Sequence, residues 1–195
     1  MRYAGSSSWQ ITIGAPWRLL VGLFVRDAAG LSPVTGIDVP SLVPAVEVRA
    51  GLAPWAVGEA AGQWARWWEG ELGRREGLAR GFSLSDGGFG AGPELDALMR
   101  ECFDDAVRWG SARRREEVEA VTRRGSVNSE AELVRTVEAE IGRTVRPFEL
   151  DVTELPVAGA YGRRVSSGHV VVSRALRADA SAYQRWLLPV IRELA

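Results

Sequence analysis

Strand-like segments stand near both ends of this chain, and a long stretch of helical periodicity, residues 54–142, separates them. At the amino-terminal end, Gln10–Ile13 alternates and Trp17–Val25 is a second apolar run rich in branched side chains. At the other end, Phe148–Val152 alternates and Tyr161–Ser173 has the pattern of a hairpin. Strands grouped at the ends predict an α+β fold, in which a mainly antiparallel sheet from the N- and C-terminal strands packs against about four or five helices.

The helical segments carry recognisable start and stop signals. Proline at the first helical position and capping boxes of the Ser-x-x-Glu/Gln type mark their amino-terminal ends. The predicted helices begin at Pro54, Pro93, Arg113, Ser129 and Ser181. Gly110 and Gly142 are the expected stops of the second and fourth helices, and Pro189 should kink or split the last one.

A chain of 195 residues is the usual size of one domain. We therefore expect a single α+β domain over residues 1–195. It would comprise a strand and loop region (1–50), a mostly helical region (54–142) and a hairpin followed by a terminal helix (145–195).

The residue types that are missing exclude several kinds of chemistry. All 24 basic residues are arginine, so the chain has no lysine for a Schiff base or a Walker-type phosphate site. One cysteine, Cys102, and one histidine, His169, exclude disulfides, cysteine cages and sites with two histidines. We expect no metal site and no cofactor. The arginine-rich composition is typical of a GC-rich, bacterial genome.

The charge and the hydropathy pattern bear on the partners and the location of the protein. The formal net charge of −1 favours neither nucleic acid nor an anionic membrane. The longest apolar run, Leu19–Val25, is too short to span a bilayer and lacks the flanks of a signal peptide. We therefore expect a cytoplasmic protein with no membrane span.

Tryptophan is unusually frequent, with eight residues against five phenylalanines and three tyrosines. The helical period places Trp64 and Trp68 on the buried stripe of the first helix and Trp67 on its flank. Because tryptophan is enriched at interfaces, Trp67 is a candidate for a partly exposed binding residue. Core packing is the alternative for the whole cluster.

Arginines and glycines give three further binding candidates. Arg163 and Arg164 form a basic pair without a close acidic neighbour and are candidates for binding a carboxylate or phosphate. Arg113–Arg124 pairs its arginines with glutamates four residues apart, which indicates a solvated helix and no nucleic-acid site. The glycine-rich loop 86–92 is interpreted as a connector, although a ligand at its junction with a helix stays an open alternative.

Acid–base chemistry has few candidates. His169 is the one imidazole, and Ser166 and Ser167 precede it, but a structural role is the more frequent one for a single histidine. Glu101, Asp104 and Asp105 are grouped, although interleaved arginines indicate a solvated helix face.

Two functional hypotheses follow. The first is a non-catalytic protein that acts in protein–protein interaction or assembly, through an aromatic surface around Trp67, with another protein or with a second copy. The alternative is a small-molecule enzyme that uses carboxylates and His169 for acid–base chemistry. The sequence contains no catalytic motif, which favours the first.

Overall fold

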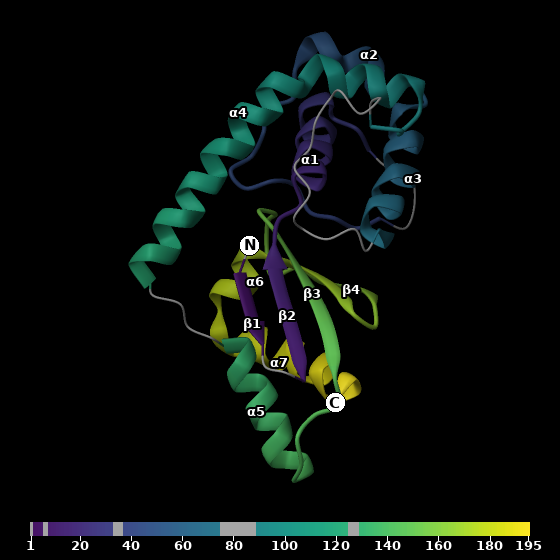
Figure 1. Cartoon of the computed structure of the whole chain (residues 1–195). Coiled ribbons are helices and arrows are strands. Elements are labelled where there is room, and N and C mark those ends of the chain that lie inside the picture. Colours follow the sequence, from purple (N-terminus) through teal and green to yellow (C-terminus); the bar gives the residue numbers. More distant parts are fainter. Residues whose placement is uncertain (1, 6–7, 33–36, 75–88, 125–128) are drawn as a thin grey trace. The chain divides into compact units, whose positions relative to one another are not determined.

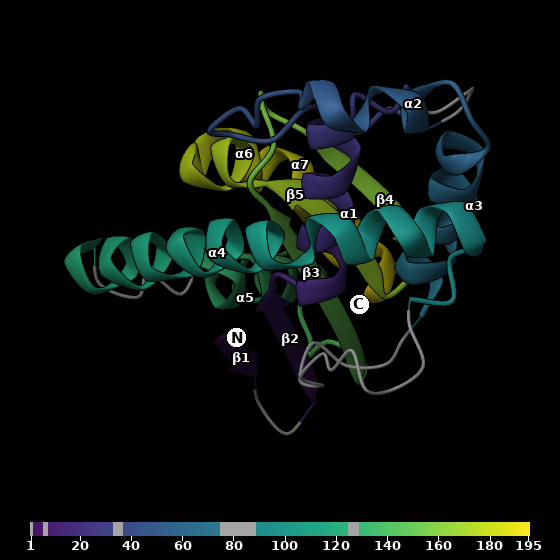
Figure 2. The same ribbon diagram turned by 90° about the horizontal axis from the view of Figure 1, so that it is seen from above.

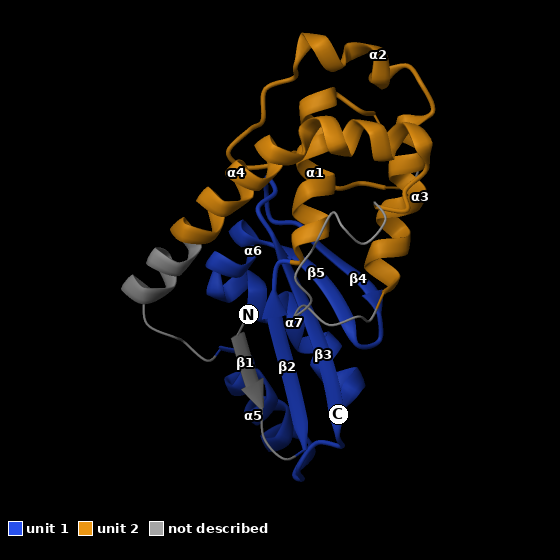
Figure 3. Cartoon of the chain, turned by 45° about the horizontal axis from the view of Figure 1, so that its top comes forward, with its two compact units in different colours: residues 1–15, 122–195 blue, residues 16–121 orange. Residues whose placement is uncertain are grey.

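The chain forms two compact units, which are coloured separately in Figure 3. Unit 1 comprises Met1–Ala15 and Thr122–Ala195, and unit 2 is the inserted segment Pro16–Val121. A computed structural model describes residues 2–5, 8–32, 37–74, 89–124 and 129–195, without the side chains of 2–5 and 117–124. The single-domain expectation stays a prediction, and each unit is described by itself.

Unit 1 is built on a five-stranded sheet in the order β1-β2-β3-β5-β4 (Figure 1). The three central strands β2, β3 and β5 are parallel to one another, and the edge strands β1 and β4 are antiparallel to their neighbours. The strands are β1 (Arg2–Gly5), β2 (Trp9–Gly14), β3 (Phe148–Leu155), β4 (Gly162–Ser166) and β5 (His169–Ser173).

The expectation of a mainly antiparallel sheet is wrong, because the sheet is mixed. The hairpin of β4 and β5 is confirmed, but β5 enters between β3 and β4 and so runs parallel to β3. Strand β2 is parallel to β3 because a long helical crossover returns the chain to the same end of the sheet. The strands are also not confined to the chain ends, since two helices follow β5.

Three helices of unit 1 pack on one face of this sheet: α5 (Ser129–Ile141), α6 (Arg174–Ala178) and α7 (Ala180–Leu194). Every second residue of β2, β3 and β5 points into this core, as Val170 and Val172 do in β5. The N-cap of helix α7 is Asp179, whose side chain accepts a hydrogen bond from the Ala182 amide, two residues before the predicted cap Ser181. Pro189 lies inside α7 without splitting it.

Unit 2 is helical, and the predicted strand Trp17–Val25 is a helix in the structure. Its elements are α1 (Trp17–Ala29), η1 (Ala50–Leu52), α2 (Ala53–Ala56), α3 (Ala60–Gly73) and α4 (Pro93–Arg124). The run Trp17–Val25 was expected to be a strand but forms α1, which is apolar on nearly all sides and largely buried. A short, fully apolar run has no periodicity that separates the two structures.

One other prediction for unit 2 differs from the structure. Gly110 does not end α4, which continues as one helix to Arg124 (Figure 2). Gly110 instead lets another side chain approach, because a Cβ there would lie 2.7 Å from Cη2 of Trp17.

Tryptophan against glycine is a repeated contact of this protein. A Cβ at Gly22 of α1 would lie 2.2 Å from Cζ3 of Trp67, and one at Gly162 of β4 would lie 2.5 Å from Cε2 of Trp186. In both places, as at Gly110, the missing side chain lets a large flat ring lie directly on the backbone. Much of the tryptophan excess therefore serves packing.

None of the described helices combines the length and the apolar character needed to cross a bilayer.

Candidate functional site

Trp67, the predicted binding residue, is buried with 6% of its surface exposed, so the expected exposure is wrong. Helix α3 is buried along two adjoining faces, and the flank that carries Trp67 packs against α1 at Gly22. The Arg18 guanidinium lies 6.0 Å from the Trp67 ring centroid. The prediction assumed that this helix buries one stripe of side chains, and it is wrong because α3 packs against more than one neighbour.

The indole N–H groups of α3 differ in their hydrogen bonding. Nε1 of Trp64 donates to the Gly22 carbonyl at 2.8 Å, which ties α3 to α1. Nε1 of Trp67 and Nε1 of Trp68 are shielded from solvent and have no acceptor in the described part of the chain. A buried donor without an acceptor costs about 1–3 kcal/mol, so each of these two N–H groups is a place where an added acceptor would stabilise the protein.

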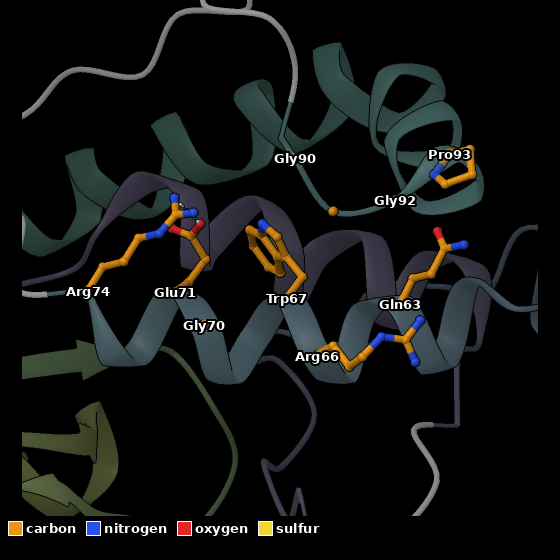
Figure 4. A pocket seen from close by; sticks show the side chains of 10 residues that line it. Gln63, Arg66, Trp67, Gly70, Glu71, Arg74, Gly90, Gly92 and Pro93 are labelled. Carbon is orange, nitrogen blue, oxygen red and sulfur yellow. Dashed lines mark hydrogen bonds and ion pairs between the residues drawn. The ribbon is translucent and has the colours of Figure 1, made fainter.

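A pocket of about 400 Å³ lies beside Trp67 in unit 2, between α3 and the segment that leads into α4 (Figure 4). Its volume lies in the range of small-molecule sites. The lining residues are Gln63, Arg66, Trp67, Gly70, Glu71, Arg74 and 90–93. In Figure 4 the indole nitrogen of Trp67 is on the ring edge nearer to the chain through Gly90.

The charges around this pocket are unevenly compensated. Both carboxylate oxygens of Glu71 accept hydrogen bonds from Arg18, at 2.9 and 3.0 Å, and Arg74 donates a further one at 2.9 Å. Arg66 is exposed and forms no ion pair with any described residue. The wall is therefore positive at Arg66, where no carboxylate offsets the guanidinium.

The glycine-rich loop contributes to this pocket only through its last residues, since 86–88 lie outside the described part. Gly90 and Gly92 have φ of 64° and 108°, which favour glycine. The amides that follow are already used: Leu95 N–H donates to Gln63 Oε1 at 2.9 Å, and Ala91 N–H donates to Asp96 Oδ1 at 3.1 Å. These two amides are therefore not free to bind an anion.

A second feature of unit 2 is an exposed apolar segment, residues 43–57. Of the four large hydrophobic side chains that are exposed among the described residues, three belong to it: Val43 (53%), Val48 (64%) and Val57 (89%). Its only charged residues are Glu47 and Arg49. In Figure 2 the segment follows the upper rim of unit 2 and ends at α2.

This apolar segment is fixed to the helices at two points. Just before it, Arg26 donates to the carbonyls of Val39 (2.6 Å) and Pro40 (2.8 Å), while Asp27 accepts from the Leu42 amide at 2.7 Å. Within it, the Arg49 amide donates to the Ala28 carbonyl at 2.8 Å, and its guanidinium forms an ion pair with Asp105. The exposed valines are thus presented on an anchored backbone.

His169, the candidate for acid–base chemistry, is half-buried at the start of β5 in unit 1. Its Nε2 lies 2.9 Å from Oγ1 of Thr153, and Asp151 and Ser166 are its register partners on the neighbouring strands. A hydroxyl and an imidazole in hydrogen-bond contact are the elements of nucleophilic catalysis, but Thr153 is only 1% exposed.

The arginine pair 163–164 lies on the edge strand β4. Arg164 forms an ion pair with Glu193 of α7, so it is not the isolated cation that the sequence indicates. The register with β5 shifts between Arg164 and Ser166. A bulge and arginines on an edge strand disfavour pairing with a further strand, so this edge is protected against sheet extension.

The most buried charges of unit 1 were missed by the sequence analysis. Glu130 is 1% exposed and accepts hydrogen bonds from Arg177 (3.0 Å) and from the Tyr183 hydroxyl (3.1 Å), and Arg177 also donates to Glu154 at 2.9 Å. Burial lowers the pKa of Arg177, but Glu154 and Glu130 outweigh it and raise this pKa. Burial, followed by Glu130, raises the pKa of Tyr183. The sequence feature closest to this network was the predicted capping box at Ser129, which contains Glu130.

The acidic group on α4 is solvated rather than assembled into a site. Asp105 forms ion pairs with Arg108 and Arg49, and the hydrogen bond from Arg108, followed by that from Arg49, lowers the pKa of this carboxyl. Glu101 and Asp104 are exposed. No group of three metal-ligating side chains occurs among the residues that the structure describes.

The stretch Arg113–Arg124 was predicted to form ion pairs between residues four apart, but the ion pair that the structure describes there has another spacing. Arg113 forms an ion pair with Glu116 at 2.7 Å, three residues away. The side chains of Glu117, Glu119 and Arg123 lie outside the described residues, so the pairs with four-residue spacing stay predictions.

Comparisons with protein-family models, with curated proteins and with solved structures found no match for this chain.

Proposed function

We propose that this protein is a non-catalytic interaction protein, and that residues 43–57 of unit 2 are its docking surface for an apolar face of another protein. The observation that carries the proposal is the concentration of exposed valines, Val43, Val48 and Val57, in this one segment. The proposal keeps the interaction function predicted from the sequence but moves its surface away from the buried Trp67.

The anchored backbone supports this assignment. The hydrogen bonds of Arg26 and Asp27 before the segment, and those of Arg49 within it, fix the main chain in the unbound protein. A surface that is already ordered loses less conformational entropy on binding than a flexible one. The valines are therefore suited to a partner with a complementary apolar surface.

The charge of the segment favours a protein partner over nucleic acid or a lipid surface. Its single basic residue, Arg49, already pairs with Asp105, so the segment offers no free cation to a phosphate. Binding to phosphate backbones and to anionic membranes depends on clustered basic residues.

Capture of partners from the native cell tests the proposal when a matched pair of variants is compared. Val57→Glu places a charge in the segment at a position that is 89% exposed. The control Ile141→Glu places the same charge at the fourth exposed large hydrophobic residue of the described chain, which is 39% exposed and belongs to unit 1.

We expect a protein that is retained by the wild type and by Ile141→Glu and lost with Val57→Glu, confirmed with the purified partner by titration. Loss of at least about tenfold in affinity corresponds to 1.4 kcal/mol. Retention of every captured protein by Val57→Glu and by Val48→Glu would refute the docking surface. Binding to lipid vesicles in place of a protein would also refute it.

A small-molecule enzyme is the second candidate, and the contact between His169 and Thr153 at 2.9 Å favours it. Its test is a turnover assay against a library of ester and phosphoester substrates. A turnover that is lost in both His169→Gln and Thr153→Val, with the folded state intact by circular dichroism, would support catalysis at this pair and contradict the non-catalytic proposal.

A further inference from the structure

The stretch 45–49, inside the proposed docking surface, has an open backbone edge, and we infer that it binds a β-strand of the partner protein in antiparallel pairing. The inference rests on the proposed function and specifies the partner chemically. That partner presents an extended segment with apolar side chains at alternate positions and a basic side chain between them. The stretch belongs to unit 2 alone.

The first observation is the course of the backbone. Between Pro44 and the helix η1, which begins at Ala50, residues 45–49 run without a turn or a bend. Arg49 has φ of −92° and ψ of 121°, which lie in the β region. Val46 and Val48 are β-branched and therefore suit a strand. The stretch already has the conformation that strand pairing requires.

The second observation is that the hydrogen-bonding groups of this backbone are open. Residues 45–48 form no backbone hydrogen bond with any other described residue, and only at the end of the stretch does the Arg49 amide donate to the Ala28 carbonyl, at 2.8 Å. Three of these four residues are exposed, and Val46 is half-buried. An accessible row of unpaired N–H and C=O groups is a template on which another chain can add a strand.

The contact of Arg49 determines which edge is open. In an extended backbone, successive N–H groups point to opposite edges, and the N–H and C=O of one residue share an edge in antiparallel pairing. Because the Arg49 amide faces Ala28 of α1, the N–H and C=O groups of Val46 and Val48 point to the other edge. These two residues therefore offer a donor and an acceptor each to a partner strand.

The side chains of the stretch define the sequence that would pair with it. In an extended backbone, Val46 and Val48 share one face and Glu47 lies on the other. Glu47 is exposed and forms no ion pair within the described chain, whereas Arg49 is already paired with Asp105. Directly opposite residues of paired strands contact each other, and opposite charges there are favourable. The complementary strand therefore carries apolar residues opposite the two valines and a basic residue opposite Glu47.

The experiment uses the blocked pentapeptide Thr-Val-Arg-Val-Thr, titrated into the ¹⁵N-labelled full-length protein and followed by the backbone amide signals. In one control peptide, glutamate replaces the arginine. In a second, both valines are N-methylated, and in a third the arginine and the last threonine are. Methylation removes an N–H and keeps the side chain. In the inferred pairing the valine N–H groups face the protein, and those of the arginine and the threonines face away from it.

We expect a saturable shift of the amides of residues 45–49, with protection from hydrogen exchange at Val46 and Val48 and none at Glu47. Methylated valines should weaken binding about tenfold or more, because two backbone hydrogen bonds are lost. Methylation of the arginine and the threonine should leave the affinity unchanged. The glutamate peptide should bind about two- to fivefold more weakly than the arginine peptide, and Glu47→Arg should reverse this preference.

The inference is overturned if the pentapeptide gives no saturable shift at residues 45–49, if the two methylated peptides bind equally, or if the protection does not alternate. The proposed function has a separate readout, since Val57 lies outside the stretch. Loss of a captured protein with Val57→Glu, without binding of the pentapeptide, would retain the docking surface and refute the strand pairing. Retention of every captured protein by Val57→Glu and by Val48→Glu, with the expected peptide binding, would refute the docking function instead.

Discussion

The two units of this protein both bury polar groups, but they differ in the largest network and in the indole donors. In unit 1, the buried Glu130 is surrounded by donors from Arg177 and Tyr183, and Arg177 links it to Glu154. In unit 2, Nε1 of Trp67 and Nε1 of Trp68 are buried without an acceptor in the described residues. A completed network contributes to one packed state, whereas open donors leave capacity for another molecule.

The exposed large hydrophobic side chains are also unevenly distributed between the two units. Three of the four large ones in the described chain lie in unit 2, and so does the pocket beside Trp67. Under the proposed function, unit 2 would carry the binding surface and unit 1 would serve as its scaffold. The following changes test this contrast, from the largest expected effect to the smallest.

Arg177→Leu should have the largest effect, because it leaves Glu130 and Glu154 buried without their shared cation. Removal of one partner from a buried ion pair costs about 3–5 kcal/mol of unfolding free energy. Urea denaturation measures the loss, and hydrogen exchange by mass spectrometry locates it. Faster exchange confined to unit 1 would sharpen the contrast. Equal loss of protection in both units would show cooperative unfolding, as the single-domain prediction requires.

The second variant, Glu130→Gln combined with Arg177→Leu, is the control for that experiment. It removes one of the two buried charges that the single variant leaves unpaired, so part of the lost stability should return. If the double variant is less stable than Arg177→Leu by the full cost of a second substitution, the network does not act as a unit.

Gly22→Ala should destabilise unit 2 by about 1–3 kcal/mol, because the added methyl group would lie 2.2 Å from Cζ3 of Trp67. Tryptophan fluorescence during urea unfolding is a suitable probe, since six of the eight tryptophans belong to unit 2. In a Trp67→Leu background the same substitution should cost much less. An equal cost in both backgrounds would contradict the ring-on-glycine contact.

Cys102 gives a smaller, pH-dependent effect in unit 2. Burial raises the pKa of this thiol from 9.0 to about 11; Arg49 opposes the shift, and Asp105 and Glu101 add to it. Between these values the folded chain binds more protons than the unfolded chain, so stability falls as the pH rises from 9.0 toward 11. The loss should be smaller in Cys102→Ala than in the wild type. Parallel pH profiles of the two proteins would show that the thiol contributes nothing.

Glu140→Gln should have the smallest effect. Hydrogen bonds from Arg192, at 2.8 and 2.9 Å, lower the pKa of Glu140, but both side chains are exposed. A lowered pKa contributes stability above the ordinary carboxyl range that is lost as the pH falls through it. Solvent and salt screen this exposed pair, so at about 0.15 M ionic strength thermal unfolding should show no resolvable change. A clear drop in Tm would mean that surface pairs carry part of the stability of unit 1.

Local patterns predicted much of the secondary structure. The start of α4 at Pro93, helix α5 from Ser129 with Gly142 after it, strand β3 and the hairpin of β4 and β5 all follow from caps, glycines and periodicity. Each of these signals acts over a few residues, so the sequence around the element is sufficient to predict it.

The candidate sites were predicted less well. Trp67 was predicted to be partly exposed, but it is buried because it packs on Gly22, 45 positions earlier in the chain. The valines of residues 43–57 carried no motif. Their importance depends on which neighbours they lack, and that is known only after the chain has folded.

By itself, the sequence determined the absence of lysine chemistry, the alternation that buries Val170 and Val172, and the helix ends marked by proline, serine and glycine. The tertiary structure decided that Trp17–Val25 is a helix, that β5 lies between β3 and β4, and that Glu130 meets Arg177. The first set depends on side-chain chemistry and on backbone preferences over one or two turns. The second depends on contacts between residues far apart in the chain, whose energies compete only once the core has formed.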